Sequence, residues 1–206
     1  SCSMNYKKQR KRWSILHPAS YRRRNMNICL FGAASALIDA NYMKAVEELG
    51  EMMAKKGHTM IYGAGATGLM GAAARGMSKI HGRQIVGIAP RFFDTEGILY
   101  KQCSEMIYTD TMRERKSLME EKADAFIMVP GGIGTFEEFF EVLTLNQLGQ
   151  MHKPIAIYNI NGYFNELYDL LKHIVKASFA EENILQMFTL YENAEEMLSD
   201  LEHSSH

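Results

Sequence analysis

The chain has 206 residues, of which 47% are hydrophobic and 23% are charged, and its formal net charge is −1. A chain of this length fits one globular domain with a sizeable core. The near-zero net charge excludes a protein whose whole surface attracts nucleic acid. Since no stretch of the sequence approaches ~18 uninterrupted apolar residues, we expect neither a membrane span nor a membrane partner.

The first segment, residues 1–26, is a basic arm. It contains no acidic residue, because the first one in the chain is Asp39. We interpret the arm as a solvated or partly disordered N-terminal segment, so nucleic acid is not expected as a partner; an arm that binds nucleic acid is the alternative. The basic side chains of the arm are Lys7, Lys8, Arg10, Lys11, Arg12, Arg22, Arg23 and Arg24.

From residue 27 to residue 206 the pattern predicts one domain in which strands alternate with helices. Short, continuously apolar strands between helices are typical of an α/β fold with a doubly wound parallel sheet and helices on both faces. Ligands bind such sheets at the C-terminal ends of the strands. In chain order we expect a strand at 27–32, a helix at 40–56, a strand at 58–62, a helix at 69–80, strands at 84–89 and 105–109, a helix at 112–122, a strand at 125–129, a helix at 139–145, a strand at 154–160, a helix at 163–177, a strand at 188–191 and a helix at 194–201.

Residues 63–68, with the sequence GAGATG, match the GxGxxG pattern between a predicted strand and a predicted helix. Such a segment suggests a dinucleotide-binding fingerprint, which requires an acidic residue at the end of the next strand to hold the ribose. That strand instead ends in Pro90 and Arg91, and the next acid is Asp94. Three interpretations stay open: NAD(P) binding, glycines that merely allow tight strand–helix packing, and a contact to a mononucleotide, which we favour.

The segment 130–138, PGGIGTFEE, is the most informative part of the chain. The strand expected at 125–129 runs into it, and the helical segment at 139–145 follows it. Glycines at a strand-to-helix corner let the backbone approach a ligand closely, and the helix N-terminus behind them favours an anion. Glu138 then lies about one turn into the helix, beside the molecule that carries the anion. The pattern predicts a phosphate-binding loop with a carboxylate next to it, which is typical of an enzyme.

A second charged element precedes this loop. Residues 112–116, MRERK, begin a helix that follows the fourth predicted strand. Because adjacent strand ends of a parallel sheet point into the same crevice, we expect Arg115 and Lys116 to converge with the amides of the glycine loop on one phosphate. The alternative is a solvated, charged helix face.

The cysteine and histidine residues are too dispersed for a disulfide framework or a metal site. Cys2, Cys29 and Cys103 are widely spaced and odd in number, which suits a reducing cytoplasm. The histidines stand singly, where we expect surface or packing roles. We therefore predict a cytoplasmic protein with no metal and no cofactor.

Four elements occur in one order: FGAA at 31–34, YGAGATGLMG at 62–71, the MxxRK element, and PGGxGTxxE. Together, over residues 27–177, they resemble the Lonely Guy (LOG) family of cytokinin riboside 5′-monophosphate phosphoribohydrolases, which are often mislabelled lysine decarboxylases. The resemblance implies a Rossmann-like enzyme that cleaves the N-glycosidic bond of a purine ribonucleoside 5′-monophosphate, with adenine or a cytokinin as the base, to free base and ribose 5-phosphate. It also implies a homodimer, which agrees with apolar residues on more than one face of the segments 139–148 and 163–168.

The resemblance assigns roles to residues as well. Arg115 and Glu138 are implied as the catalytic pair, with the phosphate at the glycine loop. Two departures concern substrate preference: Arg113 stands where the family usually has His, and Ala33-Ala34 where it usually has Ser-Ser. The implied substrate-binding residues are Lys116, Gly131, Gly132, Ile133, Gly134, Thr135, Glu137, Thr144, Gly32 and Gly65.

These assignments fit the chemistry of a ribose–purine bond, whose cleavage builds positive charge on the sugar and negative charge on the leaving base. Glu138 can stabilise the cation or activate the attacking water, while Arg115 holds the phosphate or the ribose. The alternative function is a non-catalytic carrier of a nucleotide or of the molybdenum cofactor on the same fold, which does not need this pair. A pyridoxal-phosphate decarboxylase would need a Schiff-base lysine, whereas Lys116 beside Arg115 is better explained as a phosphate partner.

Overall fold

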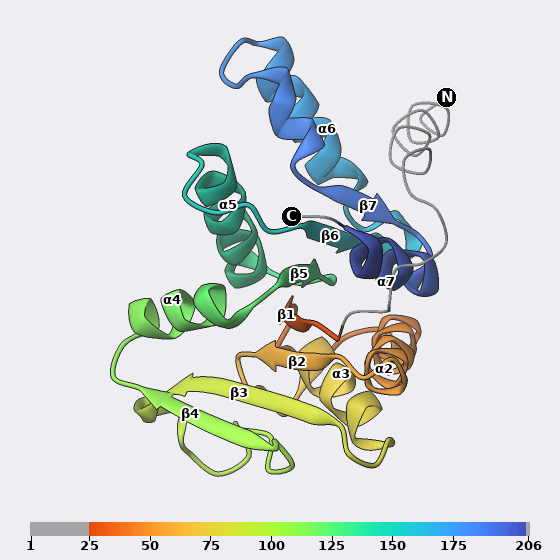
Figure 1. Cartoon of the computed structure of the whole chain (residues 1–206), viewed down its shortest axis with the longest axis vertical. Coiled ribbons are helices and arrows are strands. Elements are labelled where there is room, and N and C mark those ends of the chain that lie inside the picture. Colours follow the sequence, from red (N-terminus) through yellow and green to blue (C-terminus); the bar gives the residue numbers. More distant parts are fainter. Residues whose placement is uncertain (1–24, 205–206) are drawn as a thin grey trace.

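A computed structural model of the protein describes residues 25–204, so the basic arm predicted at 1–26 lies almost wholly outside the described residues. These residues form one seven-stranded sheet with the strand order β4-β3-β2-β1-β5-β6-β7 (Figure 1). Every pair of neighbouring strands is parallel. The strands are β1 (Asn27–Phe31), β2 (Thr59–Tyr62), β3 (Gln84–Pro90), β4 (Glu105–Thr109), β5 (Ala125–Met128), β6 (Ile155–Tyr158) and β7 (Thr189–Tyr191).

Helices cover both faces of the sheet, which confirms the predicted α/β, doubly wound fold class. The first face packs against α2 (Ala40–Lys55), α3 (Gly68–Ser78) and α7 (Ala194–His203). The second packs against α4 (Met112–Lys122), α5 (Ile133–Gln147) and α6 (Asn165–Lys176). Alternate residues of one strand supply the two cores, as in β1, where Ile28 and Leu30 face the first and Cys29 and Phe31 the second. None of the helices in residues 25–204 is long and apolar enough to cross a membrane.

Two features of the connections differ from the expectation. Short 3-10 turns that the sequence pattern did not reveal follow β3 (η1, Arg91–Phe93), follow β6 (η2, Ile160–Gly162) and precede β7 (η3, Glu182–Gln186). In addition, α5 runs from Ile133 to Gln147, beyond the apolar segment expected at 139–145, so its first turn includes Gly134 and Glu138 lies about one turn into the helix, as expected. The apolar periodicity misses that turn because Ile133 and Gly134 are exposed there.

The path of α4 corrects the argument that was used to bring the two motifs together. The strand before α4 lies at one edge of the sheet, and the strand after it pairs with β1 near the middle, so β4 and β5 are not neighbours. The adjacency that the prediction assumed is therefore wrong. The helix instead crosses back over the sheet, packing on β1, β2, β3 and β4 on the way to β5. This crossover carries the MRERK residues over the ends of the intervening strands.

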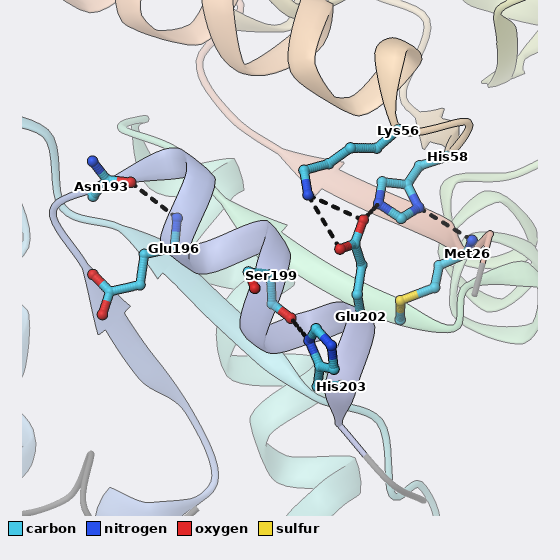
Figure 2. Close-up of polar contacts among 8 residues, drawn as sticks. All are labelled: Met26, Lys56, His58, Asn193, Glu196, Ser199, Glu202 and His203. Carbon is cyan, nitrogen blue, oxygen red and sulfur yellow. Dashed lines mark hydrogen bonds and ion pairs between the residues drawn. The ribbon is translucent and has the colours of Figure 1, made fainter. Parts of the chain in front are cut away.

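At the opposite end of the sheet, a buried polar cluster fixes α7 to the start of β2 (Figure 2). The Glu202 carboxylate binds Lys56 Nζ at 3.1 Å and lies 3.1 Å from Nε2 of His58. The other ring nitrogen of His58 accepts a hydrogen bond from the amide of Met26 at 3.3 Å. Since Nδ1 is an acceptor, the neutral ring carries its proton on Nε2 and donates it to Glu202. The predicted packing role for this histidine is confirmed, because the side chain is buried.

Candidate active site

Three loops meet at the C-terminal ends of β1, β2 and β5. The amide of Ala33 donates to the carbonyl of Pro130 at 3.1 Å, which joins the loop after β1 to the loop after β5. The carbonyl of Ala33 in turn accepts from the amides of Leu69 and Met70, at 2.9 and 3.2 Å. The loop after β2 is tied to the same segment by Thr67, whose hydroxyl donates to the Ala34 carbonyl at 2.7 Å. The N-terminal amides of α3 are therefore used inside the protein.

The glycines of the GAGATG segment are explained by close packing. Gly68 has a φ of +63°, and a Cβ atom there would come within 2.4 Å of the Ala33 carbonyl oxygen. A Cβ atom on Gly63 would lie 2.0 Å from Nη2 of Arg115. Gly65 bridges to Leu99 in the long loop before β4. These contacts support the packing interpretation of this loop over a dinucleotide cradle, because its helix N-terminus is already occupied.

The loop after β5 is built in the opposite way, with its helix N-terminus open. Gly132 caps α5, and it is exposed together with Ile133 and Gly134. A Cβ atom added to Gly132 or Gly134 would meet no atom of residues 25–204 within 4 Å. Helix geometry leaves the first amides of α5 without an intrahelical acceptor. Within the part of the chain that the structure describes, this end of the sheet therefore presents backbone donors and a positive helix end to an anion.

Gly131 differs from the other glycines of this loop because its position requires the absence of a side chain. It is buried, and a Cβ atom there would lie 2.0 Å from the Thr135 hydroxyl oxygen and 3.0 Å from the Ala33 amide nitrogen. Gly32, at the end of β1, is confined in the same manner by Val129, whose Cγ2 would be 2.5 Å from an added Cβ. The backbone of the candidate cradle is thus fixed by its own packing.

The helix that carries the second motif starts at a capping box. Thr111 Oγ1 accepts from the amide of Glu114 at 3.1 Å, and the Glu114 carboxylate accepts from the Thr111 amide at 3.3 Å. This cap fixes where α4 begins, and therefore which of its residues face the sheet. Arg115 is buried by this register, whereas Arg113 is exposed. Arg113, at the position where the family usually has His, consequently lies on the outer face of the helix.

Arg115 and Glu138 form a nearly buried ion pair. Nη2 of Arg115 lies 3.5 Å from Oε1 of Glu138, and the two side chains are only 9% and 14% exposed. Nη1 of Arg115 contacts the sulfur of Met112 at 3.7 Å, and Nε is buried without a hydrogen-bond partner in residues 25–204. A guanidinium has five N–H donors. The pair therefore has donor capacity left for a ligand.

Two carboxyl groups at this site titrate far from their ordinary range. Burial raises the pKa of Glu138 to about 7, although the nearby Arg115 charge opposes the shift. Burial, and then the charge of Glu141, raise the pKa of Glu120 to about 7 as well. Both carboxyls line one small hollow together with Phe31, Lys116, Met119 and Glu141. Perturbed carboxyls in one hollow are typical of functional sites.

Lys116 faces carboxylates rather than the amides of the glycine loop. It forms ion pairs with Glu137 and, at 2.7 Å, with Oε2 of Glu141. The hydrogen bond to Glu137, followed by that to Glu141, raises the pKa of Lys116. The expected convergence of both cations on the loop amides is therefore not what the structure displays: Arg115 and Lys116 are each paired with acids of α5.

The structure does not bring every predicted site residue together. Thr144 lies farther along α5, where its hydroxyl donates to the Phe140 carbonyl at 2.7 Å. Sequence reasoning also missed Glu120, although it lies four residues after Lys116, which places both on one face of a helix. It missed Tyr163 as well, whose hydroxyl donates to the Gly131 carbonyl at 2.7 Å. No local pattern signalled this contact, because it depends on the pairing of β6 with β5 in the assembled sheet.

Comparison with known proteins identifies a family and several relatives that the chain resembles. The family model described as "Possible lysine decarboxylase" matches residues 70–201. The probable cytokinin riboside 5′-monophosphate phosphoribohydrolase LOGL3 of Oryza sativa subsp. japonica is 32% identical over 174 residues, which cover 84% of this chain and 82% of that protein. The cytokinin riboside 5′-monophosphate phosphoribohydrolase LOG2 of Arabidopsis thaliana is 33% identical over 175 residues, which cover 85% of this chain and 82% of that protein.

Solved structures share the fold at lower identity. The molybdenum cofactor binding protein of Rippkaea orientalis superimposes with a TM-score of 0.63 at 18% identity, over 87% of this chain and 97% of that one. The molybdenum cofactor carrier protein of Chlamydomonas reinhardtii gives 0.65 at 17% identity, over 86% and 96%. At such identities the likeness extends to the fold alone. The family model and the relatives at 32% and 33% identity confirm the resemblance read from the motifs: the chain belongs to the LOG family, a family of phosphoribohydrolase enzymes.

Proposed function

We propose that this enzyme hydrolyses the N-glycosidic bond of a purine ribonucleoside 5′-monophosphate, of the adenosine or cytokinin type, to free base and ribose 5-phosphate. The observation that carries the proposal is the buried Arg115–Glu138 pair, 3.5 Å apart, behind an open helix N-terminus. An anion site and a carboxyl whose pKa is about 7 are the two parts that cleavage of a nucleotide requires. The names of the relatives, at 32% and 33% identity, agree with this reaction.

The 5′-phosphate is assigned to the loop after β5. The exposed residues Gly132, Ile133 and Gly134 offer backbone N–H groups at the positive end of α5. Ile133 is 87% exposed, so its side chain leaves the loop unobstructed. Thr135, buried in the first turn, supplies a hydroxyl at the same end of the helix.

The chemical step is assigned to Glu138. The bond between C1′ and the purine nitrogen breaks with its electron pair going to the base, and a water oxygen bonds to C1′. Ionised Glu138 stabilises the sugar cation and takes the proton of that water, which it later returns to solvent, while the leaving base takes up a proton from solvent. With its pKa raised to about 7, the carboxyl is partly ionised at neutral pH and is a stronger base than an ordinary carboxylate.

Arg115 is assigned to binding and orientation. A guanidinium stays protonated throughout the accessible pH range, so it acts as a fixed charge and a donor. Its guanidinium carries several N–H donors beside its contact with Glu138, so one side chain can hold a ribose or phosphate oxygen and the carboxylate together. Lys116 is assigned to hold Glu137 and Glu141 in place next to this pair.

A carrier of a nucleotide or of the molybdenum cofactor is the second candidate. It is supported by the shared fold of the two molybdenum cofactor proteins, whose TM-scores are 0.63 and 0.65. A protein that only binds its ligand does not require a carboxyl group buried against an arginine. Burying two charged groups costs desolvation free energy, so such a pair is better explained by a catalytic role. The identity to the phosphoribohydrolases, 32–33%, also exceeds the 17–18% to the cofactor proteins.

A direct assay tests the proposal. Purified protein is incubated with AMP and, separately, with isopentenyladenosine 5′-monophosphate, and free base and ribose 5-phosphate are followed. Arg115→Ala and Glu138→Gln should each lower the rate ~100-fold or more, whereas Glu121→Gln, an exposed carboxylate on α4, should leave it unchanged. Binding of both nucleotides without release of base by the parent protein would refute the hydrolase and favour the carrier.

We further propose that the enzyme is a cytoplasmic homodimer. Several large apolar side chains of α5, α6 and the segment after α6 are exposed on the single chain, and a second copy would cover them. Light scattering coupled to size-exclusion chromatography should give twice the mass of one chain, and a monomer would contradict the dimer. The side chains are Phe140, Leu148, Leu170 and Phe179.

A further inference from the structure

We propose that Tyr163 is a positioning residue that sets the orientation of the Gly131–Gly132 peptide in the phosphate loop, an inference that rests on the proposed function. Tyr163 lies in the turn between η2 and α6. This turn follows β6, which pairs with β5, so it stands next to the loop that follows β5. The tyrosine hydroxyl donates to the carbonyl oxygen of Gly131 at 2.7 Å.

A hydrogen bond to this carbonyl also fixes the amide that follows it. The C=O and N–H groups of a trans peptide point in opposite directions within one plane. Residues 25–204 contain no cis peptide bond. With the Gly131 carbonyl turned toward Tyr163, the Gly132 N–H is turned away from it. Gly132 is on the open side of the loop, where an added Cβ atom would meet nothing, so this amide is presented to the phosphate.

Gly131 and Gly132 have no side chains that would restrict rotation of the peptide group between them. Gly132 has a φ of −94°. Turning the peptide over would carry this φ into the positive range, which is costly for other residues but open to glycine. The Cα of Gly131 is held by Thr135 and Ala33, yet these contacts do not determine which way the peptide faces. The hydrogen bond from Tyr163 determines the orientation of this peptide.

The turn holds Tyr163 in place through a buried asparagine. Asn159, 4% exposed, accepts from the amide of Phe164 at 2.7 Å and donates to the Asn165 side chain at 2.9 Å. The Tyr163 ring also packs edge-on against Tyr42 and Phe164, with centroids 6.1 and 4.9 Å away. A phenylalanine at position 163 keeps these ring contacts and loses only the hydroxyl. The substitution Tyr163→Phe therefore isolates the hydrogen bond.

The experiment compares a phosphorylated ligand with its unphosphorylated counterpart. Dissociation constants of AMP and adenosine are measured calorimetrically for the parent, for Tyr163→Phe and for Tyr42→Phe. The last variant is the control, because it removes the hydroxyl group of the neighbouring tyrosine ring. KM and kcat are measured beside them, and melting temperatures are recorded. We expect Tyr163→Phe to weaken the binding of AMP and to raise the KM for AMP, each ~10-fold. Adenosine binding and kcat should stay within twofold of the parent values. Tyr42→Phe should leave all of these quantities unchanged.

Each outcome decides a different point. If Tyr163→Phe weakens the binding of AMP and adenosine equally, or weakens neither, the role of Tyr163 is overturned. A hydrogen bond that only stabilises the fold would not affect a phosphorylated ligand more than an unphosphorylated one. A parent protein that binds AMP no better than adenosine overturns it too, since the loop would then not hold the phosphate. If the parent binds AMP without cleaving any nucleotide, and Tyr163→Phe still weakens AMP selectively, the proposed hydrolase function fails while the role of Tyr163 stands.

Discussion

The guanidinium of Arg115 lies against the backbone of Gly63, where an added Cβ atom would come within 2.0 Å of Nη2. The glycine that directly follows β2 thus makes room for a charged side chain that arrives from α4. Arg115 reaches Glu138 across this space, at 3.5 Å. A residue of the GAGATG segment therefore contributes to the site through its packing against Arg115.

Gly63→Ala should lower kcat/KM ~100-fold, because the flexible guanidinium has to leave Glu138 to admit the methyl group. The fold should persist, since the atom in the way is the far end of a side chain. A double-mutant cycle with Arg115→Ala provides the control: the double variant should be no slower than Arg115→Ala alone. Additive losses would mean that Gly63 acts by another route.

The pH dependence of kcat/KM should follow the ionisation of Glu138, whose pKa burial raises to about 7. If the carboxylate is the working form, activity falls ~10-fold for each pH unit below this value. Glu120, whose pKa burial also raises to about 7, titrates in the same range. The profile of Glu120→Gln should keep the inflection, which identifies Glu138 as its source; disappearance of the inflection in that variant would reverse the assignment.

Stability should show the same titration with a definite sign. The folded protein holds the proton of Glu138 up to a pH of about 7, whereas the unfolded chain releases it near the ordinary 4.5. The contribution of this group to the free energy of unfolding is therefore full below about pH 4.5 and is lost as the pH rises to 7 and above.

Glu138→Gln cannot ionise, so at pH 8 it should be more stable than the parent by up to ~3 kcal/mol and at pH 4.5 no more stable. Urea unfolding at the two pH values measures this difference. Glu48→Gln, at an exposed position, serves as the control and should behave alike at both. A stabilisation of Glu138→Gln that is equal at pH 4.5 and pH 8 would show that burial does not govern the carboxyl.

The cluster at the other end of the sheet predicts a sensitivity to acid. Burial lowers the pKa of His58, although Glu202 opposes the shift. As the pH falls below the ordinary 6.5, the unfolded chain takes up a proton that the folded ring still refuses, so the free energy of unfolding decreases until the folded ring protonates too. His58→Gln should cost ~1–2 kcal/mol at pH 7.5 by loss of the buried hydrogen bonds. It should also flatten the decline between pH 6.5 and 5.5; an unchanged slope would place the acid sensitivity elsewhere.

The strands and most helices could be predicted because their apolar residues repeat with the period of the element. The first turn of α5 could not be read from this periodicity, since Ile133 and Gly134 face solvent to serve the loop rather than the core. The order of strands is a property of the whole sheet that no local pattern encodes, so the neighbours of β4 were assigned wrongly while the meeting of Arg115 and Glu138 was still foreseen. The interactions of Tyr163 depend on which turn lies beside which loop, and only the assembled sheet determines that.

The space at Gly63 also bears on how proteins of this fold can diverge. A glycine codon becomes an alanine codon by one base change, and the added carbon would withdraw the guanidinium from Glu138 while leaving the phosphate loop intact. Such a protein would be expected to keep its phosphate loop while cleaving its nucleotide far more slowly. A single mutational step at a packing position would thus move an enzyme of this fold toward a carrier.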